Sequence, residues 1–361
     1  MQLLLTMLDD SAFEKSSFLI LDKSNKDVND KTWCFWEDQP GPYEEIVYRR
    51  WEKGWFHSTM NSIAMDMGSY SYKMIRSIDF YKHALGRIAD SPNVRFEKDS
   101  VEKIEEDIVT TSLGESYSAS RIFDSRIPEE FVADKKSVKL AQHFLGWIVH
   151  FEEEVFEDDT FTMMDFRDKM PDTCSFMYVL PFSKTSGLLE FTFFNAKIIE
   201  KEEYEEYIKA YIEKHYPNVS YTIEDVETGV IPMTTFDFSA FHDKKITKIG
   251  TAGGWVKPSS GYSFKISQSF IKKVIENIKS GKSPHFGVAR GKNRFYDSIF
   301  LSILKDENEK GESLFDNMYN KLPAHLIFKF LDEETNYSED LRIMSKFANA
   351  TFTKSFFKQL V

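Results

Sequence analysis

The sequence predicts an α/β fold, in which a Rossmann-like domain that lacks its N-terminal strand and glycine loop carries an inserted antiparallel β-sheet domain and a helical C-terminal region. Three observations lead to this prediction. A short apolar helix is followed by an apolar strand that ends in Asp22, β-type patterns fill residues 138–195, and a glycine-rich stretch at 250–261 precedes a helix.

The N-terminal elements have the pattern of half of a parallel βαβ unit. Residues 1–9 are apolar on all sides, as in a buried helix, and residues 17–22 form an apolar run that ends in an acid, as in a strand covered on both faces. This order is typical of the second half of a dinucleotide-binding unit. Because no strand and no Gly-x-Gly-x-x-Gly loop precede Met1, we expect the sequence to begin inside a longer reading frame.

The middle of the chain is expected to be largely β-sheet. Residues 101–124 and 138–195 have strand patterns, those of 138–195 alternating as in half-buried strands. Residues 183–187 are predicted to form the turn of a hairpin between strands at 176–180 and 188–194.

Helices are expected over 199–215, over 262–279 and through most of the remainder. In the first of these, the apolar face consists of Ile208, Tyr211, Ile212 and His215, opposite a glutamate-rich face that is expected to be solvated. These patterns divide the chain into a discontinuous Rossmann-like domain (1–125 and 225–290), a β-sheet domain (126–224) and a helical C-terminal region (291–361).

Composition excludes several classes of function. The formal net charge of −12 argues against nucleic acid as a partner, because phosphate contacts need a basic face. No apolar run reaches the roughly 18 residues of a membrane span and no secretion signal is recognisable, so a cytoplasmic location is expected. Cys34 and Cys174 are far apart in the sequence and lack metal-ligand spacing, so no metal site is expected. A disulfide is not expected in the cytoplasm, and both cysteines are predicted to be small buried hydrophobic residues. The 33 phenylalanines fit an aromatic core or a long aromatic-lined cleft equally well.

Seven separated segments resemble those of one known family. They are Asn-Asp-Lys-Thr-Trp-Cys-Phe-Trp at 29–36, Phe-Asp-Ser-Arg at 123–126, Gln-His-Phe-Leu-Gly-Trp at 142–147, Met-Asp-Phe-Arg at 164–167, Leu-Glu-Phe-Thr at 189–192, Glu-Thr-Gly-Val-Ile-Pro-Met at 227–233, and the glycine-rich stretch from 250 to 262. Each alone is weakly specific, but in this order the chain resembles the lycopene cyclases, flavoenzymes that close rings at the ends of a linear carotenoid. It departs from the family in lacking the nucleotide-binding glycines and in having Phe191 in place of the second acid of a Leu-Glu-Glu-Thr motif.

The resemblance implies an FAD/NAD(P)-binding Rossmann-like domain and an isomerase reaction, the β-cyclisation of lycopene to β-carotene. A proton adds to a terminal alkene, a second double bond captures the cation, and another proton leaves. Such chemistry needs an acid, a dry aromatic cavity and a negative group that stabilises the cation. In the family a reduced FAD supplies the negative group in a redox-neutral role, and NAD(P)H is the expected electron source.

Glu190 is the predicted acid. On a strand its side chain shares a face with Leu188, Thr192 and Phe194, and a carboxyl group among such neighbours is expected to have a raised pKa and to stay protonated. Without the resemblance, a glutamate that is hydrogen-bonded on a sheet face or exposed would be the better interpretation.

Three further elements carry candidate charges. Asp165 and Arg167 share one face of a β-like segment and are expected either beside the flavin or polyene, or in a structural ion pair. Asp124, paired with Arg126, carries the same two alternatives. Glu227 is expected near a tight turn, either as a second carboxylate at the ring-forming site or as a turn-stabilising residue.

The cofactor-binding prediction rests on glycines and an acid. Gly250, Gly253, Gly254 and Gly261 would let the backbone approach a cofactor, and the following helix offers its N-terminal amides. Related flavoproteins have an aspartate where this chain has Thr251. Asp22 is suited to accept hydrogen bonds from the adenosine ribose, with turn capping as the alternative.

Aromatic residues provide the candidate contacts to the polyene and the membrane. Trp33, Phe35 and Trp36 are predicted to face developing positive charge, with an aromatic core as the alternative. Lycopene dissolves in membranes, and a C-terminal stripe fits a transient peripheral contact with the inner face of the membrane or a helix packed on its own core. The stripe consists of Phe352, Phe356, Phe357 and Leu360, with Lys354 and Lys358 elsewhere on the helix.

Two other classes of function compete with the cyclase. A flavin-dependent oxidoreductase, such as a hydroxylase or a polyprenyl reductase, would consume reduced nicotinamide in proportion to product. A non-catalytic carotenoid-binding protein follows if the missing glycine loop has no counterpart upstream. A cyclase instead gives a product of unchanged mass.

Overall fold

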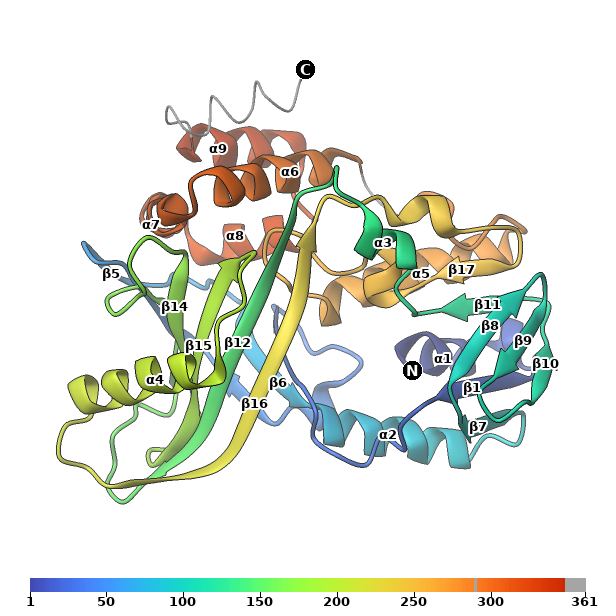
Figure 1. The fold of residues 1–361 in the computed structure, drawn as a ribbon, viewed down its shortest axis with the longest axis horizontal. Helices are drawn as coiled ribbons and strands as arrows, with labels where there is room; N and C mark the ends of the chain where they lie inside the picture. The colour runs from blue at the N-terminus through green and yellow to red at the C-terminus, as the bar shows by residue number, and fades with distance from the viewer. Residues whose placement is uncertain (289–290, 348–361) are drawn as a thin grey trace.

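The computed structural model of the protein describes residues 1–288 and 291–347. Figure 1 shows a large twisted sheet on one side, a Rossmann-like part on the other, and the C-terminal helices across one end of the sheet. The α-helices of the described residues are α1 (Gln2–Leu8), α2 (Ser77–Ala89), α3 (Glu129–Ala133), α4 (Lys201–His215), α5 (Phe264–Lys279), α6 (Gly291–Asp306), α7 (Gly311–Lys321), α8 (Ala324–Leu331) and α9 (Tyr337–Phe347).

The Rossmann-like part is built from short parallel strand pairs beside α1, α2 and α5 (Figure 1). Parallel pairs join β1 (Phe18–Asp22) to β7 (Val94–Lys98), and β11 (Ile122–Asp124) to β17 (Ile246–Lys248). A meander of β8, β9 and β10 spans residues 101–118. The expected N-terminal helix and apolar strand are therefore confirmed as α1 and β1. The strand is not covered on both faces as expected, because none of its residues is buried and Leu19 is 38% exposed.

A seven-stranded sheet forms the other part. Its order is β16-β12-β15-β14-β13-β4-β5. The strands are β4 (Lys53–His57), β5 (Ser62–Ala64), β12 (Lys139–Phe151), β13 (Thr160–Asp165), β14 (Ser175–Pro181), β15 (Ser186–Asn195) and β16 (Tyr221–Thr234). The predicted hairpin is confirmed as β14 and β15, and the sheet also takes in β4, β5 and β16, which reach beyond the segment 126–224.

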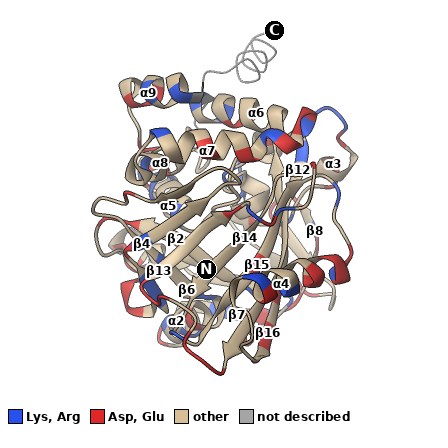
Figure 2. Cartoon of the chain, turned by 90° about the vertical axis from the view of Figure 1, so that its left-hand side faces the viewer, with Lys and Arg blue, Asp and Glu red and all other residues tan. Residues whose placement is uncertain are grey.

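The central strands are buried on both faces, which corrects the expectation of half-buried alternation. In β15, residues 187–194 are all buried. One face packs under α4, through a cluster that includes Leu189, Phe191, Phe193 and Ile208, and the other faces the C-terminal helices. In Figure 2 these strands are largely free of charged residues, whereas α4 carries acidic and basic residues on its outside.

The turn expected after Glu227 does not form, because β16 runs unbroken from Tyr221 to Thr234. Pro232 is tolerated within it because β16 is an edge strand, where a missing N–H removes no ladder bond. Gly229 serves packing instead, since a Cβ there would lie 2.4 Å from the Phe144 ring.

A three-stranded sheet and the C-terminal helices enclose the remaining side. β2 (Thr32–Glu37), β6 (Ser71–Arg76) and β3 (Arg49–Trp51) pair in the order β2-β6-β3. The predicted helical C-terminal region is confirmed over α6 to α9, and among the described residues no helix is long and apolar enough to cross a bilayer. The C-terminal stripe from Phe352 to Leu360 lies outside the described residues.

Candidate active site

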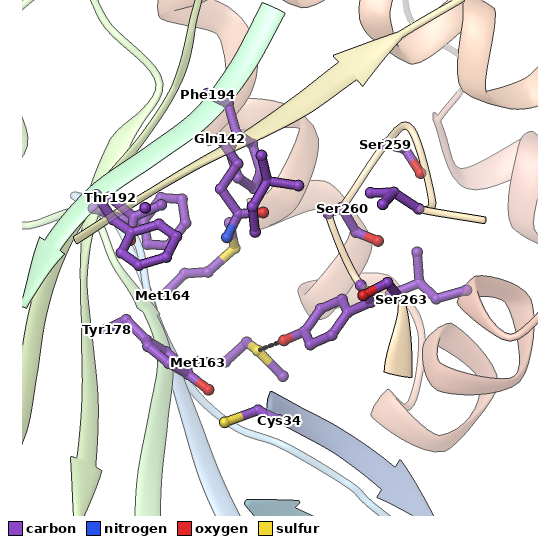
Figure 3. A pocket seen from close by; sticks show the side chains of 18 of the residues that line it. Cys34, Gln142, Met163, Met164, Tyr178, Thr192, Phe194, Ser259, Ser260 and Ser263 are labelled. Carbon is purple, nitrogen blue, oxygen red and sulfur yellow. Dashed lines mark hydrogen bonds between the residues drawn. The ribbon is translucent and has the colours of Figure 1, made fainter. Parts of the chain in front are cut away.

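A cavity of about 670 Å³ lies between the large sheet, the glycine-rich loop and the C-terminal helices. This volume is in the range of small-molecule sites in proteins. Its walls are mainly aromatic and aliphatic, with phenylalanines 144, 176, 194, 300, 315 and 330 among them. In Figure 3, Gln142 and Thr192 stand on the sheet side, opposite Ser259, Ser260 and Ser263 of the loop. The phenylalanine content therefore serves both a core and an aromatic cavity.

Glu190 on β15 lines this cavity and is only 7% exposed. The four residues predicted to share one face of the strand, at 188, 190, 192 and 194, all line the cavity. The Thr192 hydroxyl donates to Glu190 Oε1 at 2.7 Å. Burial raises the pKa of Glu190 to about 8, and the nearby carboxyl of Glu227 adds to the rise. The site thus contains a carboxylic acid that is mostly protonated at neutral pH.

Glu227 on β16 also lines the cavity, and it is fixed by β2. The backbone N–H of Thr32 donates to Oε1 at 2.9 Å, and the Thr32 hydroxyl donates to Oε2 at 2.5 Å. Burial raises the pKa of Glu227, while these two hydrogen bonds oppose the rise. The structure therefore brings Glu190 and Glu227 into one cavity, and Thr32 is a contact that sequence analysis missed.

The aromatic residues of β2 point to both of its faces. Trp33 and Trp36 line the cavity, and the Trp36 indole also donates to Asp332 at 2.7 Å. Phe35 does not line it and stacks instead on Phe264 at 5.1 Å between ring centroids. Trp33 and Phe35 share one face of β2, where both pack on Phe264, and Trp36 projects from the opposite face.

Tyrosine hydroxyls join the sheet to the glycine-rich loop at the cavity. The Tyr72 hydroxyl is 2.7 Å from that of Tyr178 and 2.7 Å from that of Tyr262, which in turn donates to the Met163 sulfur at 3.4 Å. Burial raises the pKa of each tyrosine well above its ordinary value, so all three stay neutral. These tyrosines and Cys34, which lines the same cavity, were not predicted. Alternation from Trp36 points to Cys34, whereas Tyr178 and Tyr72 lie opposite Glu190 and Trp36 only through strand pairing.

The glycine-rich loop has the features expected of a flavin cradle. Gly261 has a positive φ of +74°, and a Cβ there would meet Gln142 Oε1 at 2.0 Å. Gln142 Oε1 and Ser260 Oγ are buried without hydrogen-bond partners and both line the cavity beside the N-terminus of α5. Unpaired buried polar atoms are rare and favour a polar ligand at this edge. The chain therefore fits the polar edge of a flavin ring here.

The other predicted residues of this loop lie along the same wall. Thr251 lines the large cavity, and Gly253 and Gly254 border a second cavity of about 330 Å³. Gly250 begins a short 3-10 turn that ends at Gly253. A Cβ at Gly253 would lie 2.5 Å from the Lys248 carbonyl oxygen, so this position requires glycine.

Asp22 and Asp124 lie at the ends of parallel strands, away from the large cavity. Asp22 ends β1, accepts from the Ser24 N–H at 3.0 Å and pairs with Lys26 at 2.9 Å. Asp124 ends β11 and is paired with Arg126 and Lys248. Asp22 lies at the end of a parallel strand, the position from which an acid can bind a ribose. The contacts of Asp124 are those of a structural ion cluster.

The pair Asp165 and Arg167 does not enter the cavity. Asp165 is fully buried on the α4 side of the sheet, where it accepts from the Tyr211 hydroxyl at 2.9 Å and from Arg167 Nε at 2.8 Å. Burial acts to raise the pKa of Asp165, but the Arg167 guanidinium holds it below its ordinary value. Of the two alternatives left by the sequence, the geometry favours a structural ion pair. Phe191 faces the same way, stacked on Tyr207.

The family described as lycopene cyclase protein matches residues 9–360, nearly the whole chain. This chain belongs to the lycopene cyclase family. No curated protein is significantly similar to it in sequence.

Solved structures share the fold of this lycopene cyclase family member. A geranylgeranyl bacteriochlorophyll reductase-like protein from Thermoplasma acidophilum is 12% identical with a TM-score of 0.55, covering 97% of this chain and 90% of that one. The p-nitrophenol 4-monooxygenase PnpA from Pseudomonas putida is 12% identical with a TM-score of 0.54, covering 98% and 94%. A probable FAD-dependent monooxygenase from Pseudomonas aeruginosa, pqsL, is 9% identical with a TM-score of 0.54, covering 92% and 96%. These likenesses concern the fold, and they confirm the predicted Rossmann-like α/β class.

Proposed function

We propose that this lycopene cyclase family member is a lycopene β-cyclase, an isomerase that converts linear lycopene to β-carotene by acid-catalysed ring closure. The observation that carries the proposal is Glu190, a protonated carboxyl group in an aromatic cavity, because alkene protonation needs a neutral acid in a dry site. The aromatic walls exclude water and present ring faces to a developing cation.

The proposal includes FAD as cofactor. Gln142, Ser260 and the loop from Gly250 to Gly261 would hold the flavin ring at the N-terminus of α5, and Asp22 would hold the adenosine ribose. When bound in reduced form, FAD supplies negative charge near the cation without net oxidation. NAD(P)H as the electron source and a transient peripheral contact of a cytoplasmic enzyme with the inner membrane face belong to the same proposal.

The test is pigment analysis in lycopene-accumulating cells that express the protein or its Glu190→Gln variant. The wild-type protein should yield cyclic carotenoid of unchanged mass, and in D₂O one deuterium should enter each ring. Glu190→Gln keeps the size of the side chain and removes the acid, so we expect at least a 100-fold loss of product with unchanged flavin absorbance. Glu206→Gln, on the exposed face of α4, is the matched control.

A flavin-dependent oxidoreductase is the competing function, favoured by the reductase and monooxygenase names of the structural neighbours. It predicts consumption of reduced nicotinamide in proportion to product. Cyclic product without such consumption supports the cyclase. Wild-type protein that binds carotenoid but gives no cyclic product would contradict it.

A further inference from the structure

Glu190 and Glu227 occupy one row of the large sheet. Across β14, β15, β12 and β16, the paired positions are Tyr178, Glu190, Gly146 and Glu227. Residues paired in this way project from the same face of a sheet. Both carboxyl groups line the cavity, so a single row presents two acids to one bound molecule.

Gly146 lets the two acids approach one another. A Cβ at this position would lie 3.0 Å from Cβ and 3.3 Å from Cγ of Glu190, and 2.8 Å from Leu188 Cδ1. A side chain at position 146 would collide with Glu190 and Leu188. Glycine therefore keeps free the space between Glu190 and Glu227 in this row.

The two acids differ in their hydrogen bonds. Glu190 accepts one hydrogen bond from a side-chain hydroxyl, whereas Glu227 accepts two from Thr32, one of them from a backbone N–H. Each donor to a carboxyl group stabilises its ionised form. Two neighbouring carboxyl groups in unequal environments can divide into an acid and a base, and here the hydrogen bonds favour the ionised form more strongly at Glu227 than at Glu190.

We propose that Glu227 is the catalytic base of ring closure, which accepts the proton that leaves the ring after Glu190 has donated its own. Thr32 is then a positioning residue that holds this base ionised. The inference rests on the cyclase function proposed above.

The steps balance without a co-reactant. The Glu190 proton adds to a carbon of the terminal double bond, and the tertiary cation is attacked by the second double bond, which closes the ring. The adjacent C–H bond then breaks, its electron pair forms the ring double bond, and its proton goes to Glu227. Transfer of one proton from Glu227 back to Glu190, through solvent, restores the starting state.

The first test compares Glu227→Gln with wild type and with Glu224→Gln, a control at an exposed glutamate on the same strand. We expect Glu227→Gln to lower kcat at least 100-fold, the usual size of a general-base contribution, with KM for lycopene and flavin absorbance unchanged. Activity within threefold of wild type would overturn the inference. Wild type that makes no cyclic product would instead refute the underlying function, so the two failures are distinct.

The second test uses Thr32→Val, which removes the hydroxyl donor and keeps the backbone N–H. The variant should raise the pKa of Glu227 and move the acidic limb of the kcat/KM profile to higher pH, while the limb of Glu190 stays in place. A purely structural Thr32 would lower activity equally at every pH, and an unmoved acidic limb would overturn the proposal even if Glu227→Gln failed to fold. The other ionisable groups near Glu227 are Asp225 on its own strand, Asp30 and Lys31 before β2, Cys34 on β2 and Glu190 on β15.

Discussion

At the scale of single residues, one sheet holds two buried carboxyl groups in opposite protonation states. Asp165 is buried against the Arg167 guanidinium, and its pKa lies below the ordinary value. Glu190 is buried without a cation among its hydrogen-bond partners, and its pKa rises to about 8. The difference is whether a positive charge replaces the water that burial removes. A buried carboxyl group with no cation is costly for stability, and an acid catalyst needs that protonated state.

Glu190 should make stability depend on pH. Its folded pKa of about 8 exceeds the ordinary 4.5, so the unfolded chain releases this proton at lower pH than the folded chain. The contribution of protonated Glu190 to the free energy of unfolding is therefore complete below about pH 4.5 and is lost as the pH rises toward 8. Between about pH 5 and pH 8 we expect wild type to lose roughly 4 kcal/mol relative to Glu190→Gln, measured by urea unfolding. Parallel pH profiles of the two proteins would show that Glu190 is ionised when folded.

At the scale of elements, strand alternation places the residues of the Leu-Glu-Phe-Thr motif on opposite faces of β15. Along β15, Glu190 and Thr192 face the cavity, whereas Phe191 faces α4 and stacks on Tyr207 at 4.5 Å between ring centroids. The replacement of an acid by phenylalanine at 191 is therefore a packing change beneath α4. It leaves the acid at 190 where the cavity needs it.

The ion pair of Asp165 and Arg167 beneath α4 should contribute to stability but not to catalysis. Arg167→Ala would leave Asp165 fully buried without its cation, and we expect the free energy of unfolding to fall by about 3 kcal/mol. Cyclisation by the folded variant should stay within a few-fold of wild type, because the pair does not line the cavity. A large loss of activity at unchanged stability would instead show that this pair takes part in catalysis.

At the scale of the whole molecule, buried charges connect the glycine-rich loop to the C-terminal helices. Lys257 of the loop is 2% exposed and bonds to Asp297 of α6 at 3.0 Å and to Glu333, just after α8, at 3.2 Å. Lys265 of α5 bonds to Asp332 at 2.6 Å. These contacts fix the helices that cover the cavity against the part expected to hold the cofactor.

Substitution of Lys257 should destabilise the packing of the C-terminal helices against the glycine-rich loop. Lys257→Met leaves two buried carboxyl groups without their shared cation, and we expect it to lower the free energy of unfolding by about 3–5 kcal/mol. Lys184→Met, which breaks an exposed pair with Glu154, is the control and should cost less than about 1 kcal/mol. Equal effects of the two variants on urea unfolding would show that the buried cluster contributes no net stability.

Much of the fold follows from local pattern. The periodicity of 199–215 predicted α4 with Ile208, Tyr211 and Ile212 buried, and the apolar run at 17–22 predicted β1. The hairpin of β14 and β15 follows from two apolar runs around a short polar turn. Local pattern failed at Gly229 and Pro232, which normally indicate a turn, because edge pairing and the Phe144 ring explain both residues inside β16.

The sequence by itself indicated the family and the α/β class, and it singled out Glu190 as the proposed acid, because motif order and alternation are properties of neighbouring residues. Only the tertiary structure decided which side chains share the cavity. In the structure Glu227 lies in the same row of the sheet as Glu190, and Asp165 and Phe35 do not line the cavity. The physical reason is that strand register and the packing of α4 and the C-terminal helices bring together residues far apart in the chain, and no local pattern encodes those pairings.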